Sequence, residues 1–358
     1  MKKKSKGKVF VAMSGGVDSS VSAALLHKDG YDVTGVFIKA WQPPFVECTW
    51  GEDRRDAMRV ARILGIPFLT FDLEKEYKKN VVEYMLNEYK KGRTPNPDVV
   101  CNEKIKFGVF FERALSMGGD YIATGHYARV KKEKGGAYLL YAGKDKEKDQ
   151  SYFLWKLKQK YLSKTFFPVG KYEKKNVRKL ALKFKLPVAD KKDSQGLCFV
   201  GKLDFKDFLK KLIPVKKGKI LNIKGEIIGE HEGVELYTFG ERHGFTITKK
   251  TPNDKPYYVI GKNIKKNELV VSHKEDAIKS KKEISIEHIN WIDEKEPHLS
   301  KSYNARIRYR QPLKKIRLVK KTKEWSVIFM KNEPTATPGQ SLVVYNGEKC
   351  LGGGIISS

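Results

Sequence analysis

Residues 14–20 read Ser-Gly-Gly-Val-Asp-Ser-Ser and have the composition of a phosphate-binding turn. The segment follows an apolar run at 9–13 and precedes another at 21–26, which is the order of buried strand, tight turn and helix. Gly15 and Gly16 can adopt positive φ and let a ligand come close to the backbone. Free N–H groups and the positive end of the helix dipole face such a turn. The sequence therefore predicts that this turn binds a nucleotide phosphate.

The turn differs from two common phosphate loops. No Gly-Lys-Ser/Thr closes it, as in a Walker loop, and the third glycine of a Rossmann fingerprint is missing. An ordinary strand–helix turn with serine caps is the alternative interpretation. The segment resembles the PP-loop of the ATP pyrophosphatase superfamily, whose members cleave ATP to AMP and pyrophosphate. This short match does not identify a second substrate.

Cys101 lies in the segment 94–107, which begins Thr-Pro-Asn-Pro-Asp-Val-Val-Cys-Asn. The two prolines favour a rigid, non-helical approach. Helical spacing of apolar residues begins at Ile105, so we expect Cys101 near a helix N-terminus. There the helix dipole, together with Lys104 and Lys106, would lower the pKa of the thiol and make it reactive. The alternative is a small buried thiol at a helix start.

Cys198 lies in a polar loop bracketed by glycines, 190–201, ahead of an expected helix at 204–212. Loops of this kind often carry function, but the segment alone leaves a reactive and a structural role open. Cys48 and Cys350 are expected to be structural. No Cys-x-x-Cys pair suggests zinc, and four separated cysteines do not form a disulfide framework.

An activating nucleotide loop, two candidate thiols and a basic chain together suggest one chemistry. ATP would adenylate a poor leaving group on RNA, such as a uracil oxygen, and sulfur carried on one cysteine would displace it. A persulfide is a better sulfur donor than a thiol, because its terminal sulfur is passed on and a disulfide is left behind.

The charge of the chain points to a polyanionic partner. Its 358 residues carry 72 Lys and Arg against 42 Asp and Glu, a formal net charge of +30, and nucleic acid is the leading choice. A general lysine bias is the alternative. No apolar stretch approaches the roughly 18 residues of a membrane span, and the basic start is followed by too short an apolar run for a signal peptide. We therefore expect a cytoplasmic protein that makes no membrane contact.

Strands and helices alternate in the first half of the chain. Strands are expected at 9–13, 31–38, 66–71 and 121–124, with helices after the glycine turn and at 54–64, 74–91, 105–115 and 171–184. This alternation predicts an α/β fold with a doubly wound parallel sheet. Ligands on such sheets lie at the carboxyl ends of strands, where the glycine turn, Ile38 and Gly125 all fall.

Short strands and turns dominate after about residue 213. We predict three domains: an α/β PP-loop domain at 1–213, a small β-rich domain at 214–278 and a C-terminal β-barrel at 279–358. Residues 131–148 are expected to form a hairpin or an exposed loop. Arg306, Arg308 and Arg310 would alternate along a strand of the barrel and share one face, which suits phosphates. A solvated face is the alternative, and Tyr309 could equally be core.

The chain closely resembles the tRNA-specific 2-thiouridylase family along almost its whole length. Thr-Pro-Asn-Pro-Asp-x-x-Cys-Asn and Asp-Ser-x-Gly-x-Cys-Phe are much more specific than the PP-loop. The motifs that carry the resemblance are 14–20, 47–58, 94–107, 124–129, 148–153, 193–201, 306–311 and 336–340. The clearest departure is Ile38, where the family often has methionine; both are apolar.

The resemblance implies 2-thiolation of wobble uridine 34 in tRNAs for Lys, Glu and Gln. It implies ATP with Mg²⁺, and sulfur from a cysteine desulfurase, directly or through relay proteins. By this resemblance Cys198 bears the persulfide, and Cys101 is the nucleophile that releases the sulfur and becomes its disulfide partner. As our own hypothesis, Asp98 could act on a base proton.

The same resemblance assigns the binding residues. Contacts to ATP would come from Ala12, Met13, Ser14, Gly15, Gly16, Val17, Asp18, Ser19, Ile38 and Gly125. The target base would meet Asn96, Pro97 and Asp98. The rest of the tRNA would meet the barrel and the loops near the sheet through His126, Lys148, Asp149, Gln150, Arg308, Tyr309 and Gln340.

Two other functions remain open at this point. The chain could be another PP-loop enzyme, such as a 4-thiolating or amidating relative, or a basic RNA-binding protein without catalysis. The second is disfavoured because both cysteine loops and the PP-loop are intact together.

Overall fold

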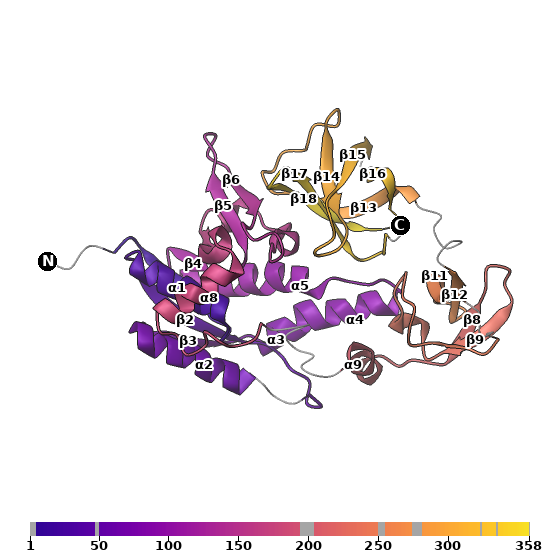
Figure 1. Cartoon of the computed structure of the whole chain (residues 1–358), viewed down its shortest axis with the longest axis horizontal. Coiled ribbons are helices and arrows are strands. Elements are labelled where there is room, and N and C mark those ends of the chain that lie inside the picture. The colour runs from indigo at the N-terminus through magenta and orange to yellow at the C-terminus, as the bar shows by residue number, and fades with distance from the viewer. Residues whose placement is uncertain are drawn as a thin grey trace.

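A computed structural model of the chain describes residues 5–46, 50–193, 204–249, 255–273, 281–322, 324–333 and 336–357. Figure 1 shows a helix-rich N-terminal part, a small β-rich part and a C-terminal barrel above the long helices. The predicted fold class, an α/β domain followed by two β-rich domains, is confirmed. Among the described helices, none is long and apolar enough to cross a membrane.

The first sheet is parallel throughout, with strand order β3-β2-β1-β4-β7. Its strands are β1 (Lys8–Ala12), β2 (Asp32–Lys39), β3 (Phe68–Asp72), β4 (Tyr121–Ala123) and β7 (Thr165–Phe166). The order of strands reverses between β1 and β4. The loops that follow these two strands therefore face one crevice at the carboxyl edge, where ligands of such sheets bind.

Helices cover both faces of this sheet, as the doubly wound prediction requires. Side chains of α1 (Val17–Lys28), α2 (Trp50–Leu64) and α8 (Lys174–Lys183) pack with Val9 and Val11 on one face. On the other face, Phe10 packs with two long helices. Alternate residues of β1 thus point into two different cores, which is why the strand reads as a continuous apolar run.

Each of those two long helices contains a π-helical stretch. The first runs through α3 (Glu74–Tyr77), a π segment (Lys78–Val82) and α4 (Glu83–Lys90). The second runs through α5 (Pro97–Val100), a π segment (Cys101–Val109) and α6 (Phe110–Ser116). The second helix begins at Pro97 rather than near Ile105 as predicted, because a proline is well suited to the first helical position. The side chain of Asn96 caps it, accepting a hydrogen bond from the Val99 N–H at 3.3 Å.

The middle domain is a five-stranded sheet of order β10-β9-β8-β12-β11. Its strands are β8 (Gly218–Leu221), β9 (Ile227–His231), β10 (Thr246–Ile247), β11 (Tyr257–Asn263) and β12 (Glu268–His273). The amphipathic α9 (Phe205–Leu212) precedes the sheet, and the Asp204 carboxylate caps it by accepting from the N–H groups of Lys206 and Asp207.

Strands β13 to β18 close into a barrel through the pairing of β13 with β18. They are β13 (Lys281–Trp291), β14 (Ser302–Arg306), β15 (Lys314–Lys321), β16 (Glu324–Glu333), β17 (Ser341–Asn346) and β18 (Lys349–Ile356). The hairpin β5 (Ala128–Lys132) and β6 (Tyr138–Ala142) adds to this sheet, since Cys350 of β18 pairs with Leu140. The expected hairpin therefore joins the N-terminal domain to the barrel, a long-range pairing that local sequence does not reveal.

Candidate active site

The glycine turn between β1 and α1 is held by its own serines. Gly15 has φ +75°, and a Cβ there would lie 2.2 Å from the Asp53 carbonyl oxygen, so only glycine fits. The Ser19 hydroxyl accepts a hydrogen bond from the Ser14 N–H at 3.1 Å and donates to the Gly16 carbonyl at 3.2 Å. Among the described side chains, none caps the N-terminus of α1. The turn therefore leaves helix N–H groups for an anion.

The loop after β4 packs directly on this turn. A Cβ at Gly125 would lie 2.6 Å from the Ser19 backbone nitrogen, so only glycine allows the two loops to approach so closely. Next to it, the His126 ring lies 6.0 Å from the ring of Phe107, on the helix that carries Cys101. The 125–126 loop thus contacts both the glycine turn and the Cys101 helix. Ile38, at the end of β2, lies on the same edge and is partly buried.

An ion-pair cluster that sequence reasoning missed adjoins the turn. The Nζ atom of Lys174, at the start of α8, lies 2.7 and 2.9 Å from the two carboxylate oxygens of Asp18 and 2.8 Å from Asp193. The Tyr127 hydroxyl donates to Asp18 at 2.8 Å. Burial and the neighbouring Asp18 carboxylate raise the pKa of Tyr127, which stays a neutral donor.

Two further cations bind Asp193, the last described residue before 194–203. Lys148 lies 2.6 Å from it and Arg178 3.1 Å. Burial alone would raise the pKa of Asp193, but hydrogen bonds from Lys148 and Lys174 lower it to about 2. Lysines are so frequent in this chain that spacing gave no signal for this cluster.

The predicted base-binding residues lie at the start of the Cys101 helix. Asn96 caps it, and Pro97 and Asp98 occupy its first turn. Burial raises the pKa of Asp98, an effect that the nearby positive charge of Lys106 opposes. Cys101 is half-buried and begins the π segment, so it lies in the second turn of the helix, near the N-terminus as expected.

Of the other three cysteines, only Cys350 lies among the residues that the structure describes. Cys350 is fully buried in β18, and burial raises the pKa of its thiol to about 12, which fits the expected structural role. Cys198 and Cys48 lie outside the described residues. The two-thiol mechanism therefore stays a prediction.

Several residues assigned to tRNA by resemblance make internal contacts. His126 is buried, with Nδ1 2.6 Å from the Thr124 hydroxyl, and burial holds its pKa well below the ordinary value. Asp149 is 3% exposed and accepts from the N–H groups of Gly143 and Ser151. The Lys148 ammonium donates to Asp193, and the Gln150 side-chain oxygen accepts from the Tyr127 N–H. Their contacts with RNA stay predictions.

The predicted row of three arginines on one strand face is wrong. Strand β14 ends at Arg306, whose guanidinium turns inward, 4.9 Å from the Tyr345 ring centroid and 3.3 Å from the Asp149 carboxylate. Arg308 and Arg310 follow in a turn, where Arg310 has φ +62°. The strand ends there because the pairing of β14 with β17 stops at Arg306.

Around this turn, the remaining predicted tRNA residues occupy different settings. Arg308 is exposed, with one nitrogen 3.4 Å from the Thr337 hydroxyl. The Tyr309 ring lies against Phe153, with centroids 4.6 Å apart. Gln340 donates its side-chain amide to the N-terminal domain. Arg308 is therefore the best placed of them for a phosphate.

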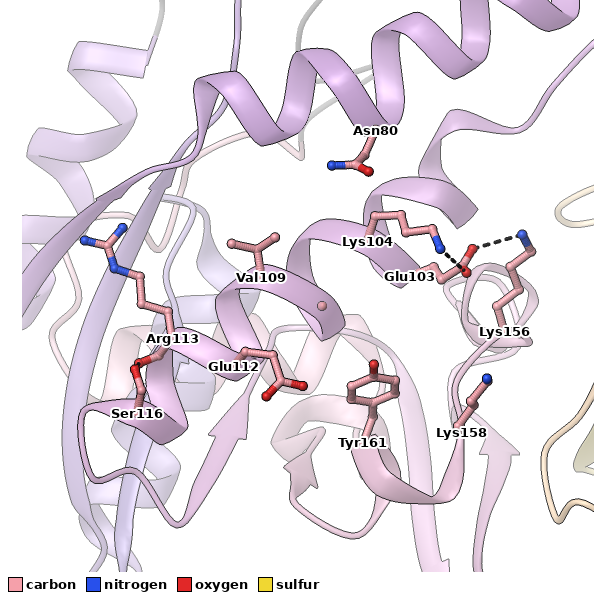
Figure 2. A pocket seen from close by; sticks show the side chains of 11 residues that line it. Asn80, Glu103, Lys104, Val109, Glu112, Arg113, Ser116, Lys156, Lys158 and Tyr161 are labelled. Carbon is pink, nitrogen blue, oxygen red and sulfur yellow. Dashed lines mark hydrogen bonds and ion pairs between the residues drawn. The ribbon is translucent and has the colours of Figure 1, made fainter.

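A surface pocket of about 850 Å³ lies along the Cys101 helix, but it is not the candidate site. Figure 2 shows that side chains of the two long helices and of the segment 156–161 line it, and that Glu103 pairs with both Lys104 and Lys156, each at 2.9 Å. Its lining carries more cations (Lys104, Arg113, Lys156, Lys158) than carboxylates (Glu103, Glu112), and none of the predicted site residues lines it.

A parallel sheet with a phosphate turn at its switch point, followed by two β-rich domains, defines a nucleotide-binding α/β protein with appended β domains. Three family models match in series: the tRNA methyl transferase HUP domain at 7–202, the tRNA methyl transferase PRC-barrel domain at 206–273 and the aminomethyltransferase beta-barrel domain at 281–356. The predicted boundaries 1–213, 214–278 and 279–358 stay predictions.

Curated relatives match the whole chain. The tRNA-specific 2-thiouridylase MnmA of Streptococcus uberis is 44% identical over 362 aligned positions, which cover 99% of this chain and 96% of the relative. The MnmA of Streptococcus equi subsp. zooepidemicus is 44% identical over 358, with 98% and 95% covered. The chain belongs to the tRNA-specific 2-thiouridylase family.

One solved structure shows a weak likeness to the chain. The U34-tRNA thiolase NcsA from Methanococcus maripaludis has a TM-score of 0.36 and 18% identity, with 59% of this chain and 65% of that chain covered. This likeness adds nothing to the family assignment.

Proposed function

We propose that the protein is an ATP-dependent tRNA sulfurtransferase that converts wobble uridine 34 to 2-thiouridine. The observation that carries the proposal is the 125–126 loop, which contacts the phosphate turn through Gly125 and the Cys101 helix through His126. Activation by a nucleotide and attack by a thiol need such neighbouring groups. The relatives named 2-thiouridylases support the same chemistry.

Methyl transfer, which two of the family descriptions mention, is less well supported. A sulfonium methyl donor carries no phosphate, whereas the turn at 14–20 leaves backbone N–H groups at a helix N-terminus for an anion. A half-buried thiol on the neighbouring helix suits sulfur chemistry.

The first step would activate the base. ATP would bind with its phosphates on residues 12–19 and its adenosine toward Ile38 and Gly125. Mg²⁺ would enter with ATP, because phosphate oxygens are among the ligands that it prefers. The uridine O2 attacks the α-phosphate, and pyrophosphate leaves.

The second step would exchange oxygen for sulfur. The terminal sulfur of a Cys198 persulfide attacks C2, and AMP leaves with the former O2. The Cys101 thiolate then attacks the Cys198 sulfur, which frees the 2-thio group and leaves a Cys101–Cys198 disulfide for an external thiol to reduce. Asp98, with its raised pKa, would hold or release the base proton.

The partners follow from this chemistry and from the family. We propose tRNAs for Lys, Glu and Gln as substrates and a cysteine desulfurase or relay protein as sulfur donor, with a cytoplasmic location. His126, Lys148, Asp149, Gln150, Arg308, Tyr309 and Gln340 would be the tRNA contacts.

The test is incubation of the full chain with ATP, a cysteine desulfurase, cysteine and a tRNA-Glu transcript, followed by nucleoside analysis. We expect 2-thiouridine at position 34, together with AMP and pyrophosphate. Formation of 4-thiouridine instead would indicate another PP-loop thiolase. No thionucleoside with a competent donor would refute both.

A further inference from the structure

Contacts from the middle domain and from the barrel hold the short segment 92–95 of the N-terminal domain, which directly precedes the proposed base-binding residues 96–98. From the middle domain, the Lys262 ammonium donates to the Gly92 carbonyl at 3.1 Å, and the Thr238 and Thr94 hydroxyls are 3.2 Å apart. From the barrel, Glu287 pairs with Arg93. The segment is therefore a junction whose position depends on every domain.

Gln340 makes the most direct of these contacts. Its side-chain nitrogen donates to the carbonyl oxygens of Thr94 at 3.0 Å and Pro95 at 3.2 Å. The neighbouring backbone reinforces the contact, since the Thr94 N–H donates to the Pro338 carbonyl at 2.9 Å. Gly339 has φ +93°, and a Cβ there would lie 2.8 Å from the Thr94 oxygen. The side-chain nitrogen of Gln340 is thus bound to two carbonyl oxygens within the protein.

The segment leads without a break into the helix that carries Cys101. Asn96 follows Pro95 and caps that helix, Asp98 is in its first turn and Cys101 in its second. A shift of the Thr94 and Pro95 carbonyls would therefore move the cap and the first turn together. Reaction rates are sensitive to displacements of about 1 Å at such positions.

We propose that Gln340 is a positioning residue: it ties the barrel to the 94–95 backbone and so sets the place of Asn96, Asp98 and Cys101. This inference rests on the proposed function of those three residues. It gives Gln340 a role that a contact with RNA does not require, because its effect on turnover persists when tRNA is saturating.

The test compares Gln340→Met with a matched variant, Gln159→Met. Gln159 also donates its amide across a domain boundary, to the carbonyls of Tyr138 at 2.8 Å and Ile292 at 2.6 Å, but away from 92–95. In the full chain with saturating tRNA-Glu transcript, ATP and a cysteine desulfurase, we expect Gln340→Met to lower kcat by about tenfold or more. The tRNA Kd, measured separately, reports the proposed RNA contact of Gln340 and does not enter kcat at saturating tRNA, and Gln159→Met should keep kcat within about twofold.

A second readout does not depend on thiolation. The alkylation rate of Cys101 by iodoacetamide, followed by peptide mass spectrometry, should change in Gln340→Met and stay near the wild-type rate in Gln159→Met. If the wild type formed no thionucleoside, the proposed function would fail while this readout still tested the positioning.

Other variants guard against a simple folding defect. Gln340→Lys keeps a donor for both carbonyls and should recover part of kcat, whereas Gln340→Glu, which sets a carboxylate against them, should lower kcat at least as much as Gln340→Met. A weakened tRNA Kd with unchanged kcat and unchanged Cys101 alkylation would overturn the proposal. Equal losses of kcat in the Gln340 and Gln159 variants would do the same.

Discussion

Lys174 binds both carboxylate oxygens of Asp18, at 2.7 and 2.9 Å, and so ties the first turn of α1 to the start of α8. The same ammonium reaches Asp193 at 2.8 Å, five positions before Cys198 in the sequence. The Lys174 ammonium therefore links the phosphate turn, through Asp18, to Asp193 in the motif that contains Cys198.

Lys174→Met should weaken ATP binding by about tenfold or more, because two carboxylates beside the phosphate turn lose their shared cation and repel the nucleotide. Unfolding free energy should fall by about 1–2 kcal/mol for this partly buried pair. Calorimetric titration of ATP and urea unfolding measure the two effects. Lys175→Met is the control, since the Lys175 side chain is 74% exposed, and it should change stability by less than about 0.5 kcal/mol. Equal behaviour of the two variants would contradict the prediction.

Gly125→Ala should impair formation of AMP and pyrophosphate and lower stability by about 1–3 kcal/mol, because the added Cβ would lie 2.6 Å from the Ser19 nitrogen. Pyrophosphate release and thermal unfolding measure both. Gly135→Ala, which has open space around the new Cβ, should behave as the wild type. Normal ATP cleavage by Gly125→Ala would mean that the loop after β4 does not shape the nucleotide site.

Substitution of Cys198 and substitution of Cys101 should block two different steps, sulfur loading and sulfur transfer. Cys198→Ser should abolish persulfide labelling, whereas Cys101→Ser should accept sulfur and fail to transfer it. Mass spectrometry of the loaded protein and nucleoside analysis distinguish these steps. Normal turnover by Cys101→Ser would rule out the two-thiol mechanism.

The Asp193 carboxylate should make the free energy of unfolding depend on pH below about pH 4. Its pKa in the folded protein, about 2, lies below the ordinary value of 3.8, so its contribution to stability is present above about pH 4 and is lost as the pH falls from about 4 to 2. The loss should be about 1–2 kcal/mol, and Asp193→Asn should flatten that part of the profile. Urea unfolding at several pH values tests this, with exposed Asp190→Asn as the control. An unchanged profile in Asp193→Asn would refute the assignment.

Binding of tRNA should weaken steeply with salt, because each neutralised phosphate contributes about −0.7 to −0.9 to the log–log slope. Arg308→Ala should raise the Kd and reduce that slope by about 0.7. A flat salt response in the wild type would mean that the +30 net charge is composition alone.

Local sequence determined much of the protein. The apolar runs and their periods predicted the alternating strands and helices of the parallel α/β sheet. The glycine pair predicted a tight turn with positive φ, and Gly15 has φ +75°. The motifs around Cys101 and Cys198 pointed to the family, which the relatives confirmed. The start of the Cys101 helix was misplaced because two prolines read as a break, although Pro97 begins the helix.

Only the tertiary structure decided which distant residues meet. The pair of Lys174 with Asp18, the contact of Gln340 with Thr94 and the pairing of Cys350 with Leu140 each join segments more than a hundred residues apart. Likewise, Arg306 turns inward onto Asp149 and the Tyr345 ring, which come from distant segments. Periodicity and turn chemistry act over a few residues, so they specify elements and local sites. Contacts between elements depend on how those elements pack, which no short stretch of this sequence contains.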